Sequence, residues 1–131
     1  MKLPRWIAKA TILRIHAAQL AEHGGIVGVR DEGLLDSALA RPEQKALYGE
    51  PSLSLLAAAY AYGLARNHPF LDGNKRTAYV AMELFLAKNG QMLTASDEDA
   101  VVTFLKLAAG ELSEDELSAW IETHSAPRKS P

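Results

Sequence analysis

Residues 53–88 read LSLLAAAYAYGLARN (53–67), HPFLDGNKR (68–76) and TAYVAMELFLAK (77–88), and this stretch decides the fold. The outer two segments are apolar nearly all round, which is typical of helices at the centre of a bundle. The middle segment combines an imidazole, a carboxylate, a glycine turn, an amide and two cations. A polar loop between two buried helices is costly unless a ligand uses its charges. The pattern predicts an all-α protein with a functional loop between two central helices.

Two further helices are expected before this pair. The first is predicted to begin with Pro4, which suits a first helical turn, and to end at Gly24-Gly25. The second is predicted to be capped by Asp31, to run to about residue 40 and to end at Pro42. Residues 42–51 are then expected to form a loop, and Ser52 or Ser54 to begin the first central helix.

Two more helices are expected after the pair, which gives a compact bundle of about six. Asn89-Gly90 is a left-handed stop for the second central helix. Ser96 with three acidic residues after it caps the next helix, and Ser113 with Glu116 forms a capping box for the last. Met92-Leu93 or the 42–51 loop is a candidate for a brief extended piece.

The composition describes a globular chain of 131 residues with 48% hydrophobic residues, a net charge of −2 and no cysteine. The small negative charge gives no sign of a nucleic-acid partner. No apolar run is long enough to cross a bilayer, and the N-terminus lacks the pattern of a signal peptide, so a cytoplasmic protein is expected. We predict one helical domain over residues 1–124 and a disordered polar tail over 125–131.

The residues of the loop are those that a phosphate-binding site needs. Gly73, Asn74, Lys75 and Arg76 precede or begin a helix, whose free N–H groups and partial positive charge attract anions. Asp72 looks repulsive in such a cradle unless a divalent cation bridges it to the phosphate, as Mg²⁺ does. His68 is the natural base for a hydroxyl nucleophile.

Each of these residues also has a purely structural interpretation. A histidine at a helix end is often a cap, an Asp-Gly pair is often a turn, and Lys-Arg is often solvated surface. However, cations at a helix N-terminus are unfavourable without an anion, which favours function for the cluster. A zinc site made from His68 and Asp72 is disfavoured, because Pro69 and Gly73 interrupt the helix that such ligands need.

The loop resembles the signature of the Fic/Doc family, His-x-Phe-x-(Asp/Glu)-(Gly/Ala)-Asn-(Gly/Lys)-Arg, at every position. Residues 23–25, 28–42 and 85–90 also resemble the death-on-curing branch, and the likeness covers about residues 5–122. It implies an all-α Fic fold, with His68 as catalytic base, Asp72 holding Mg²⁺, and residues 73–76 binding the phosphates of ATP. It also implies that the 42–51 loop is the flap that positions the target.

Two positions separate this chain from most adenylylating members of the family. Those members have Gly where Lys75 stands and a second Arg where Tyr79 stands. The Lys variant marks the death-on-curing branch, which implies a toxin that transfers the γ-phosphoryl of ATP to a hydroxyl of translation elongation factor Tu and blocks translation. The alternatives are a protein adenylyltransferase with the same base and cradle, or a catalytically silent binding module.

The resemblance also implies a separate antitoxin. Some Fic relatives carry an inhibitory (Ser/Thr)-x-x-x-Glu-(Gly/Asn) helix, but residues 94–98 come nearest here and Asp99 replaces the final Gly or Asn. A Phd-like antitoxin is therefore expected, with a helix that docks near the ATP cleft.

Overall fold

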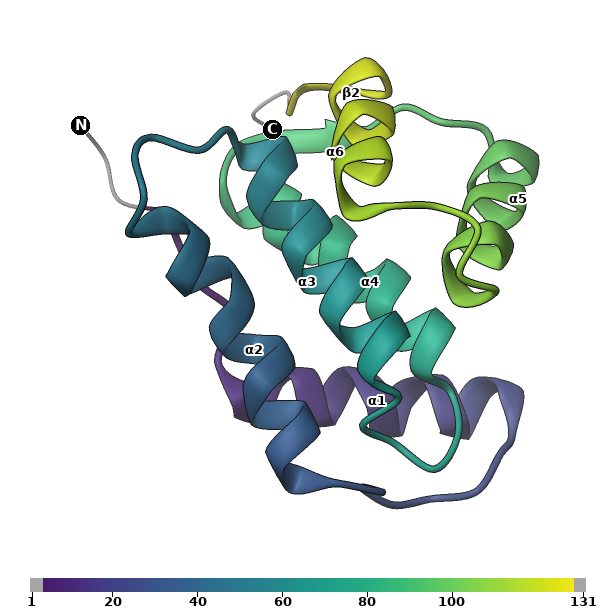
Figure 1. Cartoon of the computed structure of the whole chain (residues 1–131). Helices are drawn as coiled ribbons and strands as arrows, with labels where there is room; N and C mark the ends of the chain where they lie inside the picture. The colour runs from purple at the N-terminus through teal and green to yellow at the C-terminus, as the bar shows by residue number, and fades with distance from the viewer. Residues whose placement is uncertain (1–3, 129–131) are drawn as a thin grey trace.

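A computed structural model describes residues 4–128, which form six helices and two short strands. The elements are α1 (Lys9–His23), α2 (Glu32–Ala46), α3 (Leu53–Asn67), α4 (Asn74–Lys88), β1 (Gln91–Leu93), α5 (Asp97–Ala108), α6 (Glu114–Thr123) and β2 (Ser125–Pro127) (Figure 1). The predicted all-α bundle of about six helices is confirmed, with a small two-stranded sheet added.

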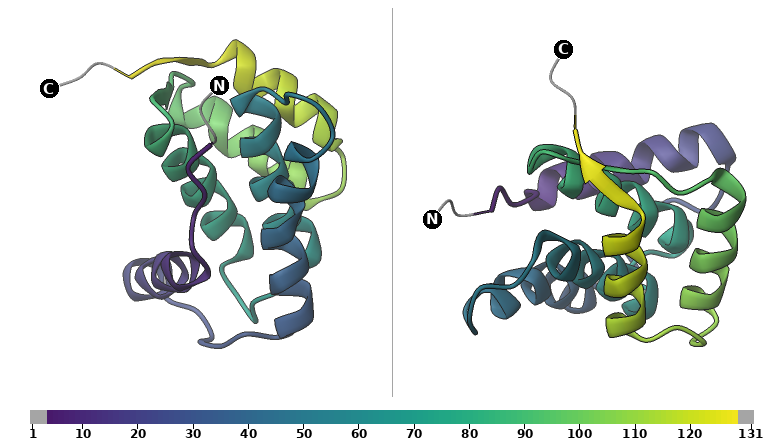
Figure 2. Two further views of the ribbon diagram at one scale, coloured as in Figure 1. Left: turned by 90° about the vertical axis from the view of Figure 1, so that its left-hand side faces the viewer. Right: turned by 90° about the horizontal axis from the view of Figure 1, so that it is seen from above.

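The centre of the bundle is α3, as its apolar sequence predicts. It packs against α2 and α4 on either side and against α5 and α6 as well, while α1 packs against α4 (Figures 1 and 2). Figure 1 shows α1 crossing the ends of α3 and α4 where the motif loop, residues 68–73, connects them. Most of the α3 side chains are buried, including Tyr60 and Leu64.

Small residues let α2 and α3 approach closely. A Cβ built on Gly63 of α3 would lie 3.1 Å from the Cα and 3.2 Å from the carbonyl oxygen of Ala38 in α2. Contacts this short leave no room for a side chain, so Gly63 sets the spacing of the two helices.

The helix starts that carry a serine cap follow the sequence prediction. Ser52, Ser96 and Ser113 each accept a hydrogen bond from the backbone N–H three residues later, and Ser113 with Glu116 forms the complete capping box. Gly90 ends the α4 turn with a positive φ of 82°, as expected for a left-handed stop.

The predicted start of the first helix at Pro4 is wrong. Residues 4–8 are extended, and α1 begins at Lys9. Other elements satisfy the backbone of this segment: Asn89 bonds both the N–H (2.8 Å) and the carbonyl (3.1 Å) of Arg5, and the N–H of Ile7 donates to the Tyr60 hydroxyl at 3.0 Å. A helical turn would break these contacts.

Pro42 does not end α2, which continues to Ala46. Proline removes one hydrogen bond from a helix interior, to the carbonyl of Ala38 here. Burial offsets this loss, because Leu35, Ala38 and Pro42 form the buried stripe of α2. The predicted loop over 42–51 is therefore shortened to about residues 47–52.

The C-terminal segment is ordered further than the sequence suggests. Disorder was expected from Ser125 onward, but Ser125–Pro127 is β2, which pairs antiparallel with β1 in a register that places Met92 opposite Ala126. The N–H of Arg128 also donates to the carbonyl of Gly90 at 2.8 Å. Backbone pairing orders this polar segment where side-chain burial does not. Residues 1–3 of the predicted domain and 129–131 of the predicted tail lie outside the described residues.

No helix among residues 4–128 combines the length and the apolar character that crossing a bilayer requires.

An ion-paired cluster joins α2 to the first turn of α6. Arg41 donates to Glu114 through Nε (3.0 Å) and Nη2 (2.7 Å), and the Lys45 ammonium lies 3.3 Å from the same carboxylate. Burial raises the pKa of the Glu114 carboxyl, but the hydrogen bonds and charges of Arg41 and Lys45 outweigh it and hold the pKa below its usual value. A carboxyl with a lowered folded pKa stabilises the fold above its unfolded pKa and loses that contribution as the pH falls through the folded pKa.

Glu114→Gln should therefore lower the free energy of unfolding by about 1–3 kcal/mol at pH 7, because a charge-assisted pair is lost. The difference from wild type should shrink as the pH falls below about 4. Urea unfolding from pH 7 down to pH 3.5 measures it, with Glu111→Gln as the exposed control. A difference that stays constant over this range would contradict the assignment.

Candidate active site

His68 occupies a backbone conformation that non-glycine residues rarely adopt. It is the C-cap of α3, with φ 49° and ψ 54°, and it is the one non-glycine residue with positive φ in the described chain. Arg30 holds this turn in place, since its Nε donates to the carbonyl of His68 (2.7 Å) and its Nη2 to that of Asn67 (2.9 Å). The His68 side chain is exposed. Such strained positions cost about 1–3 kcal/mol and gather at functional sites.

The side chain of Asn74 closes the motif loop. Its Oδ1 accepts from the N–H of Phe70 at 2.9 Å, and its Nδ2 donates to the carbonyl of Phe70 at 3.0 Å. The same Nδ2 lies 3.4 Å from Nδ1 of His68, a weak contact that steadies the ring without locking its tautomer. Both groups of the buried Asn74 amide are therefore used by hydrogen bonds within the loop, and only the backbone N–H of Asn74 is available to a ligand.

The Asp72 carboxylate lies at the surface and is held by two backbone donors. Oδ1 accepts from the N–H of Gly73 at 2.9 Å and Oδ2 from the N–H of Ile26 at 3.2 Å. Gly25 makes this possible, because a Cβ there would lie 2.8 Å from Oδ2 of Asp72. Each carboxylate oxygen keeps further acceptor capacity.

The start of α4 differs from the capped helices. Gly73 is the N-cap, with φ 76°, and no side chain caps the first turn; α1 also lacks a side-chain cap, whereas α2, α3, α5 and α6 all have one. Lys75 and Arg76 lie in this first turn, and neither pairs with a carboxylate of residues 4–128. Free N–H groups, the helix dipole and two cations thus meet at one place, which suits an anion.

Residues 24–31 run alongside the motif loop. The N–H of Arg30 donates to the carbonyl of Pro69 (2.7 Å), the N–H of Leu71 donates to that of Gly28 (3.0 Å), and Val29 forms a β-bridge with Phe70. We call residues 24–31 the strap.

The assignment of a flap to residues 42–51 is wrong in its position. Residues 42–46 belong to α2, and the loop after them lies at the far end of α3 from His68 (Figure 1). The length of α3 separates the two ends by about 22 Å. The strap, not this loop, is the segment that lies next to the site.

His16, for which the sequence predicts no role, lies against the motif loop. Its ring stacks on Phe70 with centroids 3.7 Å apart and planes 9° apart, and its Nε2 lies 2.8 Å from the carbonyl oxygen of Asp72. The available signal was position, since His16 stands four residues from both Ile12 and Leu20 in the buried stripe of α1.

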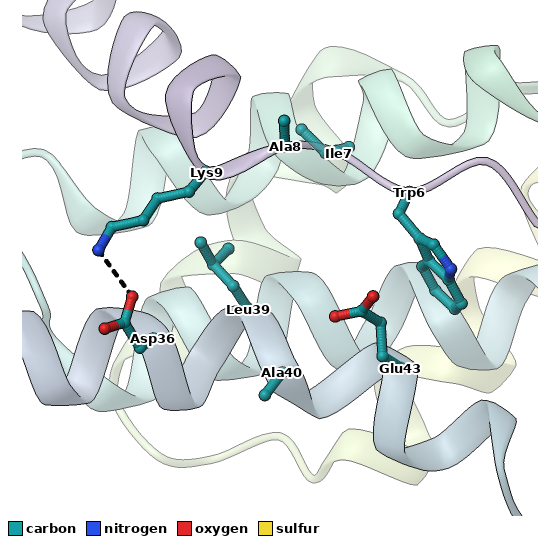
Figure 3. A pocket seen from close by; sticks show the side chains of 8 residues that line it. All are labelled: Trp6, Ile7, Ala8, Lys9, Asp36, Leu39, Ala40 and Glu43. Carbon is teal, nitrogen blue, oxygen red and sulfur yellow. Dashed lines mark hydrogen bonds and ion pairs between the residues drawn. The ribbon is translucent and has the colours of Figure 1, made fainter.

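A groove of about 420 Å³ elsewhere on the molecule is separate from this site. It lies between the extended N-terminal segment and α2, where Trp6 and Leu39 form apolar walls and Lys9 bonds Asp36 at 2.7 Å (Figure 3). None of its lining residues belongs to the motif loop or to the start of α4.

Comparisons with known proteins agree with the motif. Residues 6–86 match the model of the Fic/DOC family. The chain is 53% identical over 75 residues to a protein named "Toxin Doc" from Mycolicibacterium smegmatis, a match that covers 55% of this chain and 57% of that protein. It is 34% identical over 110 residues to "Protein kinase doc" from Escherichia phage P1, covering 83% of this chain and 86% of that protein. On the strength of the motif and these matches, the chain belongs to the Fic/Doc family, in its death-on-curing branch.

Proposed function

We propose that this protein is a toxin-type protein kinase that transfers the γ-phosphoryl group of ATP to a hydroxyl of a target protein. The observation that carries the proposal is the uncapped start of α4, where Lys75 and Arg76 have no carboxylate partner among residues 4–128 and the exposed His68 precedes them in the motif loop. The names of the two relatives, a toxin and a protein kinase, support the same activity.

The site suits Mg²⁺ that enters together with the nucleotide. Asp72 offers one surface carboxylate next to the anion cradle, and no group of three potential metal-ligating side chains converges anywhere in residues 4–128. Mg²⁺ typically binds one or two carboxylates and takes its other ligands from phosphate oxygens and water. When bound, it would neutralise charge on the phosphates. Asp72 would hold it, and the N–H groups and cations of residues 73–76 would bind the phosphate oxygens.

His68 is proposed as the general base. It would accept the proton of the target hydroxyl as the oxygen bonds to the γ-phosphorus, while the bond from that phosphorus to the β–γ bridging oxygen breaks and ADP leaves. Arg30 fixes the backbone of His68, and Asn74 steadies its ring. At 3.4 Å the contact from Nδ2 of Asn74 to Nδ1 of His68 is too long to commit either ring nitrogen, so the imidazole can still accept a proton.

Two residues of α4 favour phosphoryl over adenylyl transfer. Lys75 adds charge and volume where Gly is usual in adenylylating relatives, and Tyr79 stands where they carry a second Arg. Burial, with help from Glu83, raises the pKa of Tyr79 to about 12, so the phenol stays neutral at physiological pH. Tyr79 also packs edge-on against Phe104. The neutral Tyr79 side chain cannot form the ion pair with phosphate that an Arg would form at this position. This difference supports a nucleotide orientation unlike that of adenylylating enzymes.

We assign the strap to holding the target. Ile26 and Val27 are 65% and 78% exposed, and Leu71 of the motif loop beside them is 51% exposed. Apolar side chains presented at the rim of a site suit contact with another protein.

Translation elongation factor Tu is the proposed target. The proposed inhibitor is a Phd-like antitoxin with a helix that docks near the ATP cleft. Both would be met in the cytoplasm.

The donor group can be identified by incubating the protein with elongation factor Tu and ATP labelled at either the α or the γ phosphate. We expect label on the target from γ-labelled ATP alone. Label from α would instead identify an adenylyltransferase, and label from neither, with nucleotide binding intact, a silent binding module. Either result would overturn the kinase assignment.

His68→Ala should lower the transfer rate about 10²- to 10⁴-fold, because a positioned general base is lost. ATP affinity, measured by calorimetry, should stay near the wild-type value, since the cradle lies in α4. His23→Ala, at the exposed end of α1, is the matched control and should keep wild-type activity. A fully active His68→Ala protein would rule out this residue as the base.

The tie between the strap and Asp72 can be tested with neighbouring glycines. Gly24 and Gly25 both have positive φ, so alanine at either is strained by about 1 kcal/mol or more. A Cβ on Gly24 meets nothing within 4 Å, whereas one on Gly25 meets Asp72 and Leu20 at 2.8 Å. Gly25→Ala should therefore speed amide exchange at Ile26, by displacing Asp72, and should weaken Mg²⁺-dependent ATP binding. Equal behaviour of the two variants would contradict this contact.

A further inference from the structure

We propose that His16 is a positioning residue for the phosphate cradle, which it supports from α1 without touching a substrate. The proposal rests on the function proposed above, because it assigns His16 to the same site. The Asp72 carboxylate, which is proposed to hold the metal, and the start of α4 would then both depend on the buried His16 imidazole in a different helix.

The geometry gives His16 two separate contacts with the motif loop. The flat face of its ring lies on Phe70, with centroids 3.7 Å apart, and its edge points Nε2 at the carbonyl of Asp72, 2.8 Å away. A carbonyl can only accept, so Nε2 carries a proton and donates it. The side chain is buried, with 5% of the residue exposed, so water does not readily take over this bond.

The bond matters because of the peptide that it holds. The carbonyl of Asp72 and the N–H of Gly73 belong to one planar peptide group. The same N–H donates to the Asp72 carboxylate at 2.9 Å, and Gly73 is the N-cap of α4. Fixing the plane therefore fixes both the direction of the carboxylate and the first turn of α4, where the proposed anion donors lie.

Little space remains for the loop to move towards α1. A Cβ on Gly73 would lie 3.4 Å from Leu20 and 3.7 Å from the His16 ring. Leu20 and His16 are neighbours in the buried stripe of α1, so together they form a seat for the Asp72–Gly73 peptide. A hydrocarbon side chain at position 16 would fill the same volume, but it would leave the Asp72 carbonyl without its donor.

Loss of the hydrogen-bond donor to the Asp72 carbonyl distinguishes a positioning role for His16 from simple packing, and two substitutions isolate it. His16→Phe keeps an aromatic ring over Phe70 and removes the donor. His16→Gln removes the ring and restores a donor of similar reach. Ile12→Val, one turn away in the same buried stripe, is the control for a general loss of packing in α1.

The position of the loop is read first, without nucleotide, from the backbone amide signals of residues 70–74 in NMR spectra. We expect His16→Phe to shift the signals of Gly73 and Asn74 and to speed amide exchange at Phe70, and His16→Gln to restore them in large part. Ile12→Val should leave them near wild type. If His16→Phe leaves these signals unchanged, or Ile12→Val moves them equally, the proposal is overturned, whatever the protein's activity.

The link to the proposed function is read next from Mg²⁺-dependent ATP binding. Because removing a group that orients a metal ligand typically costs 10- to 100-fold in metal affinity, His16→Phe should weaken this binding about 10-fold and change Mg²⁺-free binding much less. In a cycle with Asp72→Asn, the effect of His16→Phe should nearly vanish, since the carboxylate that it positions is absent. Additive losses in the cycle would assign His16 to packing alone. If wild-type protein binds no ATP, the proposed function fails and the loop signals alone decide the role of His16.

Discussion

The site depends on the two hydrogen bonds that the Asn74 amide makes to Phe70. Phe70 is buried in a turn where no backbone group of α3 or α4 bonds its backbone, and the Asn74 side chain satisfies both its N–H and its carbonyl. The turn can therefore be short, and the end of α3 meets the start of α4 within residues 68–73. Since a helix carries partial negative charge at its C-terminus and positive charge at its N-terminus, the turn brings opposite helix ends together.

The two ends are treated differently by the rest of the chain. At the end of α3, the Arg30 guanidinium bonds the last carbonyls and balances their charge. At the start of α4, two cations add to a positive helix end instead of balancing it. The strap and α1 support the turn from two sides, through Ile26 on the Asp72 carboxylate and His16 on its carbonyl. The scaffold thus supports the start of α4 from two sides, while Asp72 and Arg76 next to it are exposed.

Local signals in the sequence predict most of the fold, because capping and apolar periodicity act within a few residues. Ser52, Ser96 and Ser113 each begin a helix as expected. Predictions fail where distant segments decide the outcome: Pro4 stays extended because Asn89 and Tyr60 bond the chain that follows it, and Pro42 stays helical because it is buried. For the same reason, the motif identified the candidate residues of the site, but the parts played by His16 and Arg30 could not be foreseen, since their partners lie 56 and 38 residues away.

A conflict between local rules and the whole fold is itself informative. Cations such as Lys75 and Arg76 are unfavourable in the first turn of a helix, and a non-glycine residue is uncommon in the left-handed conformation that His68 adopts. Sequences that fold well avoid such choices unless something else requires them. Here two such choices, uncompensated cations and a left-handed non-glycine residue, meet in the motif loop and the adjoining helical turn, whereas Pro42 in α2 is offset by burial. Their concentration in one place fits the proposed function, in which an anion binds at the start of α4 and His68 acts as a base, because packing alone would be satisfied by a capped helix start and a glycine in the turn.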